Sequence, residues 1–197
     1  DLNQTVNLTV NYVYEDGTTV AHGPHTDAVH FTRTATLDTV TGEVTYSDWV
    51  AVNDDDLLDT YKSAVIDGYY ADKAYSTAVT VAAEDGDVSE TVTYKKLGQW
   101  VPSFPATTPS APTDPIDYPN NPSDPTVPTD PAENPSEPGT TENPTLPYVP
   151  GYTPEGPDGE PLTTADPSTP SSGYLPPNPT NPGEDTVITY VPADQVG

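Results

Sequence analysis

Apolar and polar residues alternate along much of the first hundred positions. The alternation is clear over residues 6–14 and again over residues 29–37, each followed by a turn-forming glycine, Gly17 or Gly42. A period of two is typical of a β-strand with one buried face. We therefore predict strands over both ranges, and shorter strands over residues 44–46, 65–66, 79–81 and 88–94.

One segment, Asp54–Lys62, favours a helix. Acidic residues crowd its start, where they complement the helix dipole, and Lys62 lies near its end. A short helix among several strands predicts a β-rich α+β fold of β-grasp type.

Proline divides the chain into two halves of different chemistry. Pro24 is the one proline of residues 1–100, and all other prolines follow it in residues 101–197. Such a proline content favours extended and turn conformations over helix. The second half nevertheless keeps aromatic residues that a simple spacer would not need, such as Trp100, Tyr152 and Tyr190.

Two elements recur in the same order in both halves. Ile66-Asp67-Gly68-Tyr69 is similar to Val149-Pro150-Gly151-Tyr152, and an acidic glycine turn then leads to a strand that ends at Tyr94 or Tyr190. A recurring order of elements indicates duplication. We predict two related domains, residues 1–98 and 99–197, the second with long proline-rich loops.

The formal net charge is −26, and the chain has no cysteine. A negative field of this size repels phosphate backbones and anionic lipid, which disfavours nucleic-acid and membrane-surface binding. Without cysteine there is no disulfide framework and no thiolate metal site. The sequence also lacks G-x-S-x-G, HExxH and phosphate-loop motifs, so no enzymatic activity is predicted. We expect any export signal or wall anchor to lie outside this segment.

Several short segments of the chain have a familiar pattern. In the first half they are NLTVNY (7–12), EDG (15–17), VHFTRT (29–34) and VTGEV (40–44). In the second half they are WVP (100–102), VPGYTP (149–154) and DTVITY (185–190). In this combination the chain resembles the mucus-binding (Mub/MucBP) repeats of lactobacillus surface adhesins.

This resemblance implies two tandem β-grasp (ubiquitin-like) domains in an elongated arrangement. It also implies an extracellular, cell-wall-attached protein of a Gram-positive bacterium with neighbouring repeats of the same kind. The implied partners are host mucin glycans and, for some members, immunoglobulins. The alternative is a structural spacer that projects another adhesin from the wall. The family offers no strict binding motif that assigns residues here.

Side-chain chemistry gives a few candidate contacts. The tyrosine ring combines a stacking face with a hydroxyl, which suits glycans, and basic residues attract acidic groups. The binding candidates on this basis are Tyr69, Tyr70, Tyr75 and Arg33. His22 and His25 are interpreted as members of a solvated turn.

Calcium is the cofactor that the acidic clusters allow. It prefers hard oxygen ligands, which carboxylates and amides supply, although neither cluster follows the EF-hand order. The candidate ligands are Asn53, Asp54, Asp55, Asp56, Asp85 and Asp87.

Overall fold

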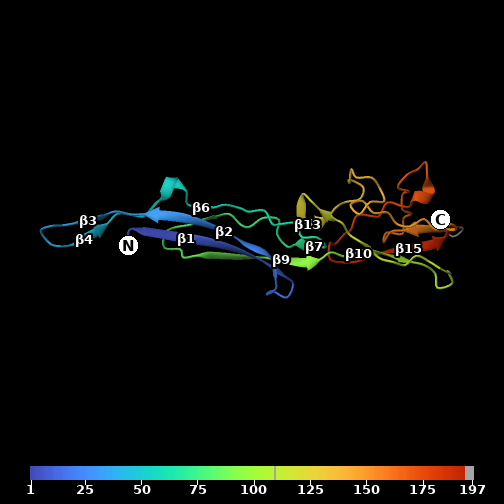
Figure 1. The fold of residues 1–197 in the computed structure, drawn as a ribbon, viewed down its shortest axis with the longest axis horizontal. Coiled ribbons are helices and arrows are strands. Elements are labelled where there is room, and N and C mark those ends of the chain that lie inside the picture. The colour runs from blue at the N-terminus through green and yellow to red at the C-terminus, as the bar shows by residue number, and fades with distance from the viewer. Residues whose placement is uncertain (109, 194–197) are drawn as a thin grey trace. The chain divides into compact units, whose positions relative to one another are not determined.

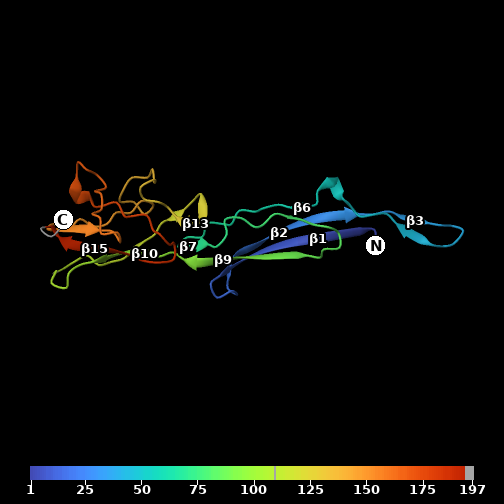
Figure 2. The same ribbon diagram turned by 180° about the vertical axis from the view of Figure 1, so that it is seen from behind.

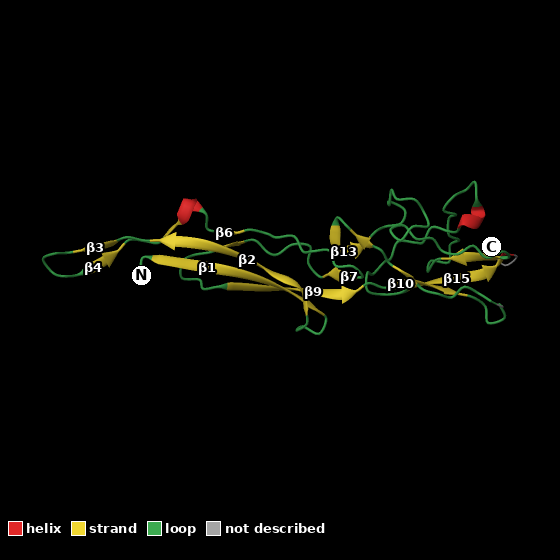
Figure 3. Ribbon diagram, in the orientation of Figure 1, coloured by secondary structure: helices red, strands yellow, loops and turns green. Residues whose placement is uncertain are grey.

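The computed structural model describes residues 1–108 and 110–193. Strands and irregular segments dominate Figure 3, and this part of the chain contains two short 3-10 helices, η1 (Val52–Asp54) and η2 (Pro170–Ser172). No helix within it is long and apolar enough to cross a membrane. The predicted β-rich class is confirmed.

The chain divides into two compact units. The first comprises Asp1–Ala64 and Lys73–Tyr94, and the second comprises Val65–Asp72 and Lys95–Gly197. The predicted domain boundary at residue 98 stays a prediction.

The first unit is built on a twisted sheet with the strand order β5-β2-β1-β9, in which β1 lies between β2 and β9 (Figure 1). Strand β1 is antiparallel to β2 and parallel to β9. Its alternate residues Val6, Leu8 and Val10 are almost fully buried, which confirms the period-of-two prediction. The bounds of these strands are β1 (Asn3–Tyr14), β2 (Val20–Thr32), β5 (Val50–Ala51) and β9 (Val88–Lys96).

Strand β2 is longer at its start and shorter at its end than the alternation predicted. It includes His22 and His25, so their assignment to a solvated turn is wrong. The pairing of β1 with β2 is irregular around Tyr12 and His22, and such an irregularity accommodates Pro24, which has no N–H to donate. The His25 ring instead stacks on Tyr61, with ring centroids 3.6 Å apart.

Beyond β2 the chain forms a separate hairpin of β3 (Ala35–Leu37) and β4 (Val44–Tyr46), which extends past the end of the sheet (Figure 2). The predicted strand over residues 29–37 is therefore interrupted between β2 and β3.

The helix predicted over Asp54–Lys62 is wrong. Asn53 and Asp54 have positive φ, and the Asp55 carboxylate accepts the N–H of Leu57, which turns the chain instead of continuing a helix. Leu57–Leu58 then forms β6, which pairs with β8 (Val79–Thr80) and buries Leu58 completely. The strand predicted at residues 65–66 is also wrong, because the strand in this region is β7 (Tyr69–Ala71).

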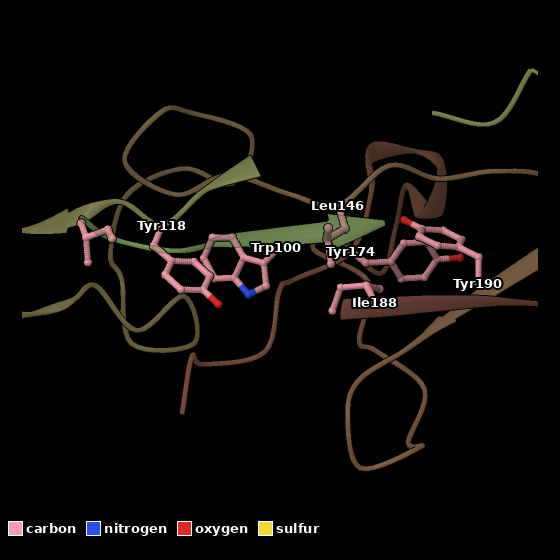
Figure 4. Packing of buried hydrophobic residues seen from close by; sticks show 7 residues of the cluster. Trp100, Tyr118, Leu146, Tyr174, Ile188 and Tyr190 are labelled. Atoms are coloured by element: carbon pink, nitrogen blue, oxygen red, sulfur yellow. The ribbon is translucent and has the colours of Figure 1, made fainter. Parts of the chain in front are cut away.

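The second unit contains a four-stranded sheet with the order β11-β10-β15-β14 and a small pair, β12-β13. Its core is the buried cluster in Figure 4, in which Trp100, Tyr118, Ile188 and Tyr190 are almost fully enclosed. The strands are β10 (Gln99–Ser103), β11 (Ile116–Asp117), β12 (Asn120–Asn121), β13 (Asp124–Pro128), β14 (Tyr152–Glu155) and β15 (Thr186–Pro192).

The two halves share a parallel pair of first and last strands. Strand β1 runs parallel to β9, and β10 runs parallel to β15. At the start of each pair a carboxylate accepts one backbone N–H of the first strand. Asp87 accepts that of Asn7 at 2.9 Å, and Asp185 accepts that of Gln99 at 3.0 Å.

The recurring glycine–tyrosine element is the same turn in both halves. Tyr69 N–H donates to the Ile66 carbonyl at 3.0 Å, and Tyr152 N–H donates to the Val149 carbonyl at 3.1 Å. Gly68 and Gly151 both have positive φ, which this turn requires.

The strand-ending tyrosines also make equivalent contacts. The Tyr94 hydroxyl donates to Ala64 O and the Tyr190 hydroxyl to Pro147 O, each at 2.6 Å and each two residues before its turn. The predicted internal repeat therefore has matching hydrogen bonds in the two halves of the chain.

Asx-Pro sequences account for many turns of the second unit. In six of them the Asn or Asp side-chain oxygen accepts the backbone N–H two residues later, across a proline that has no N–H of its own. The six residues are Asn121, Asp124, Asp130, Asn134, Asp166 and Asn181.

We predict that Tyr94→Phe and Tyr190→Phe lower the free energy of unfolding by similar amounts, about 0.5–1.5 kcal/mol each, because each leaves a carbonyl without its donor. Urea unfolding of the full chain measures both. Tyr75→Phe is the control, since its ring is 53% exposed, and it should have no effect. A loss confined to one of the two buried tyrosines would contradict the equivalence of the two contacts.

An ion pair fixes the chain next to β9 in the first unit. Lys73 Nζ lies 3.3 Å from Glu90 Oε2, and Thr77 N–H donates to Glu90 Oε1 at 3.0 Å. Burial alone would raise the pKa of the Glu90 carboxyl, but these hydrogen bonds and the Lys73 charge hold the pKa below its ordinary value of 4.5. The ionised form therefore stabilises the folded state.

We predict that Glu90→Gln costs roughly 0.5–1 kcal/mol at neutral pH, a small value because Lys73 is partly exposed. The contribution of Glu90 is present above about pH 4.5 and is lost as the pH falls through the lowered pKa. The difference between native chain and variant should shrink accordingly in acid urea melts. Glu43→Gln, in the exposed hairpin turn, should leave stability unchanged at every pH; a Glu90→Gln difference that persists in acid would refute the assignment.

Candidate functional site

The hairpin β3–β4 positions the candidate site of the first unit. Its turn is closed by Gly42 N–H donating to Asp38 O at 2.8 Å, and Gly42 has the positive φ that such a turn favours. The pairing continues past the open end of the hairpin. There Ser47 N–H donates to Thr34 O, and Thr34 N–H donates to Ser47 Oγ. This pairing brings the residues after β2 against those after β4.

At this hairpin base the Arg33 guanidinium lies over two aromatic rings. It is 4.0 Å from the centroid of Tyr46 and 4.4 Å from that of Trp49. Its Nε–H donates to Asp1 O at 2.7 Å. A guanidinium has five N–H donors, and the described residues supply no hydrogen-bond acceptor for the remaining four.

A concavity of about 580 Å³ lies around these side chains. A volume of this size is within the range of small-ligand sites. We call it the Arg33 pocket, and its polar and aromatic lining comprises Phe31, Arg33, Tyr46, Ser47, Asp48, Trp49, Asp56 and Glu84. The three carboxylates are exposed and accept no hydrogen bond from the described residues, so they face solvent with their oxygens available.

Of the predicted binding residues, Arg33 lies in this pocket. Tyr75 belongs to the same unit but lies outside the pocket, where it forms an isolated bridge with Lys62. Tyr69 and Tyr70 belong to the second unit, and Tyr70 packs against its core. The binding role of all four stays a prediction.

Sequence reasoning missed Tyr46 and Trp49 as partners of Arg33. Trp49 lies half-buried beside the Arg33 cation. The signal that could have identified these partners is the register of the hairpin. With the turn at Gly42, Ala35 opposes Tyr46, and the residues just beyond them must meet.

The calcium candidates lie in η1, in the segment that follows it, and in the loop before β9. Asp85 accepts the N–H of Ala82, and Asp87 accepts that of Asn7. The Asp55 carboxylate accepts the N–H of Leu57, and Asp56 lines the Arg33 pocket. Within residues 1–108 and 110–193, no three His, Asp or Glu side chains group closely enough to hold a metal ion. The calcium site stays a prediction, and these backbone contacts compete with it.

A larger concavity of about 810 Å³ lies in the second unit, between proline-rich loops. Two of its amides are engaged with the backbone: Asn120 bonds to Gly68, Ile66 and Tyr69, and Asn134 bonds to Ser136 and Glu142. It has no aromatic lining residue. The Arg33 pocket is therefore the better candidate, although it is smaller.

The first unit thus presents aromatic rings, a guanidinium and exposed carboxylates together on a β-rich scaffold. Residues 1–98 match the family model of the Muc B2-like domain. Through these residues the chain belongs to the mucus-binding, MucBP-like family.

Solved structures of this family are similar to part of the chain. The MucBP domain of the adhesion protein from Pediococcus pentosaceus is 35% identical over 47% of this chain and 97% of that domain, with a TM-score of 0.41. The mucin-binding domain of a Streptococcus pneumoniae protein is 27% identical over 48% and 92%, with a TM-score of 0.44.

A type 2 repeat of the mucus binding protein MUB from Lactobacillus reuteri is 29% identical over 48% of this chain, with a TM-score of 0.39. The match spans 50% of that repeat's length. No curated protein matches the chain.

We predict that Arg33→Gln destabilises the hairpin base by about 0.5–2 kcal/mol, because it removes the cation from two ring faces. Acrylamide quenching of tryptophan fluorescence should increase, since Trp49 becomes more exposed while Trp100 stays fully buried. Lys95→Gln makes the same change in net charge at an exposed position and is the control. Equal quenching of the two variants would show that Arg33 does not shield Trp49.

Proposed function

We propose that the chain is an extracellular adhesion module that binds mucin glycoproteins. The match of residues 1–98 to the Muc B2-like family carries this proposal. The Arg33 pocket supports it, because the exposed Tyr46 ring beside hydrogen-bonding groups suits carbohydrate. Attachment to the wall of a Gram-positive bacterium goes with the same proposal.

The proposed architecture is two tandem β-grasp domains with related hydrogen bonding. The parallel first and last strands of each half support it, together with the equivalent contacts of Tyr94 and Tyr190. In an array of such repeats, weak contacts would add through multivalency. An additional contact with immunoglobulin stays a prediction.

Charge constrains how such binding works. Mucins are acidic through sialic acid and sulfate, and the chain carries a formal net charge of −26. The two therefore repel each other at long range, and salt screens this repulsion beyond a distance of about 10 Å at 0.1 M. Attachment must come from short-range stacking and hydrogen bonds, or from divalent cations that bridge the two partners.

We predict that the full chain binds immobilised mucin, and that raising sodium chloride from about 0.05 to 0.5 M leaves binding unchanged or strengthens it severalfold. Surface plasmon resonance measures the response. A steep fall with salt would instead indicate that attraction to the five basic residues dominates.

Immobilised serum albumin and immunoglobulin are the controls. Binding to mucin alone supports the proposal. Binding to none of the three surfaces contradicts it and favours the spacer function, whereas binding to immunoglobulin alone favours a protein-binding module.

A further inference from the structure

We propose that the Arg33 pocket binds an uncharged sugar ring and disfavours sialylated or sulfated sugars. This inference rests on the proposed function and specifies which part of a mucin glycan the pocket takes.

The lining of the pocket opposes an anion. Arg33 is its one cation among the described residues, whereas Asp48, Asp56 and Glu84 supply three carboxylates. The Nε–H of Arg33 is already bound to Asp1 O. An anionic sugar would gain the attraction of one guanidinium and meet the repulsion of three carboxylates, in addition to the negative field of the whole chain.

The aromatic faces of the pocket already hold a cation. Aromatic faces attract cations, but here the Arg33 guanidinium already covers a face of both Tyr46 and Trp49. A lysine or arginine side chain of a partner protein would have to approach this fixed positive charge. The three carboxylates alone do not make the pocket a cation site.

A neutral sugar fits both sets of groups. Its hydroxyls donate to the three carboxylates and accept from the free guanidinium N–H groups, and both partners are stronger as charged groups than as neutral ones. Its apolar C–H face can pack on Tyr46, whose side chain is 52% exposed. A neutral sugar therefore supplies donors to the carboxylates and acceptors to the guanidinium without carrying a charge itself.

Competition on immobilised mucin tests the charge of the ligand. We expect free galactose or N-acetylgalactosamine to release the full chain at millimolar concentration, and N-acetylneuraminic acid to have no effect at matched ionic strength. Prior treatment of the mucin with sialidase should leave binding unchanged or increase it. Release by N-acetylneuraminic acid, or a loss of binding of more than about threefold after sialidase, would overturn the proposal.

Variants of the full chain test whether the sugar binds in the Arg33 pocket. Tyr46→Ala should weaken mucin binding about tenfold, and Tyr75→Ala, which truncates a tyrosine of nearly equal exposure outside the pocket, should not change it. Glu84→Gln removes an exposed carboxylate without a protein partner, so it keeps the fold, and it should weaken binding severalfold. Equal binding by Tyr46→Ala, Glu84→Gln and the native chain would overturn the assignment while leaving the adhesion function intact.

A direct titration separates the two proposals. Galactose should change the fluorescence of Trp49 in a saturable way, against the constant signal of buried Trp100, and Arg33→Gln should reduce the change. If the chain binds no mucin but shows this titration, the adhesion function fails and the sugar site stands. If it binds mucin without this titration, the sugar site fails.

Discussion

The parallel pairing of the first and last strands constrains everything between them in each half. Parallel neighbours cannot be joined by a tight turn, so a long segment must cross over and return. That crossover usually contains a helix, but here strands and irregular segments carry it, and the backbone groups of the irregular segments need other partners. Tyr94 and Tyr190 bind one carbonyl each, and Asp and Asn side chains bind many of the N–H groups. Much of the large negative charge thus belongs to residues that shape turns.

Alternation was a reliable guide wherever one face of a strand is buried, as in β1 and β9. The helix prediction over Asp54–Lys62 failed because helix starts and Asx turns use the same acidic residues. Nothing local separates these outcomes. The burial of Leu58 against β8, which is distant in sequence, decides between them. The short strand predicted at residues 65–66 failed similarly, because the glycine turn leading to Tyr69 displaces the strand.

The sequence predicted only part of the candidate site. Arg33 stood out as one of few basic residues, but its neighbours depend on hairpin register. Placing the turn at Gly42 fixes Ala35 opposite Tyr46, and from this pair the proximity of Arg33 to the residues after β4 follows. The exposed carboxylates of Asp56 and Glu84 come from separate loops, so their presence in the pocket depends on tertiary structure that no local pattern encodes.

The parallel strand pairs also determine how each half resists mechanical force. When a chain is pulled by its two ends, strand β1 and its parallel partner β9 are drawn in opposite directions along their length. The hydrogen bonds of the ladder are then loaded together in shear, whereas an antiparallel terminal hairpin would open one bond at a time. The same geometry holds for β10 and β15. Under the proposed function, a module held between a cell surface and mucus would experience this kind of load.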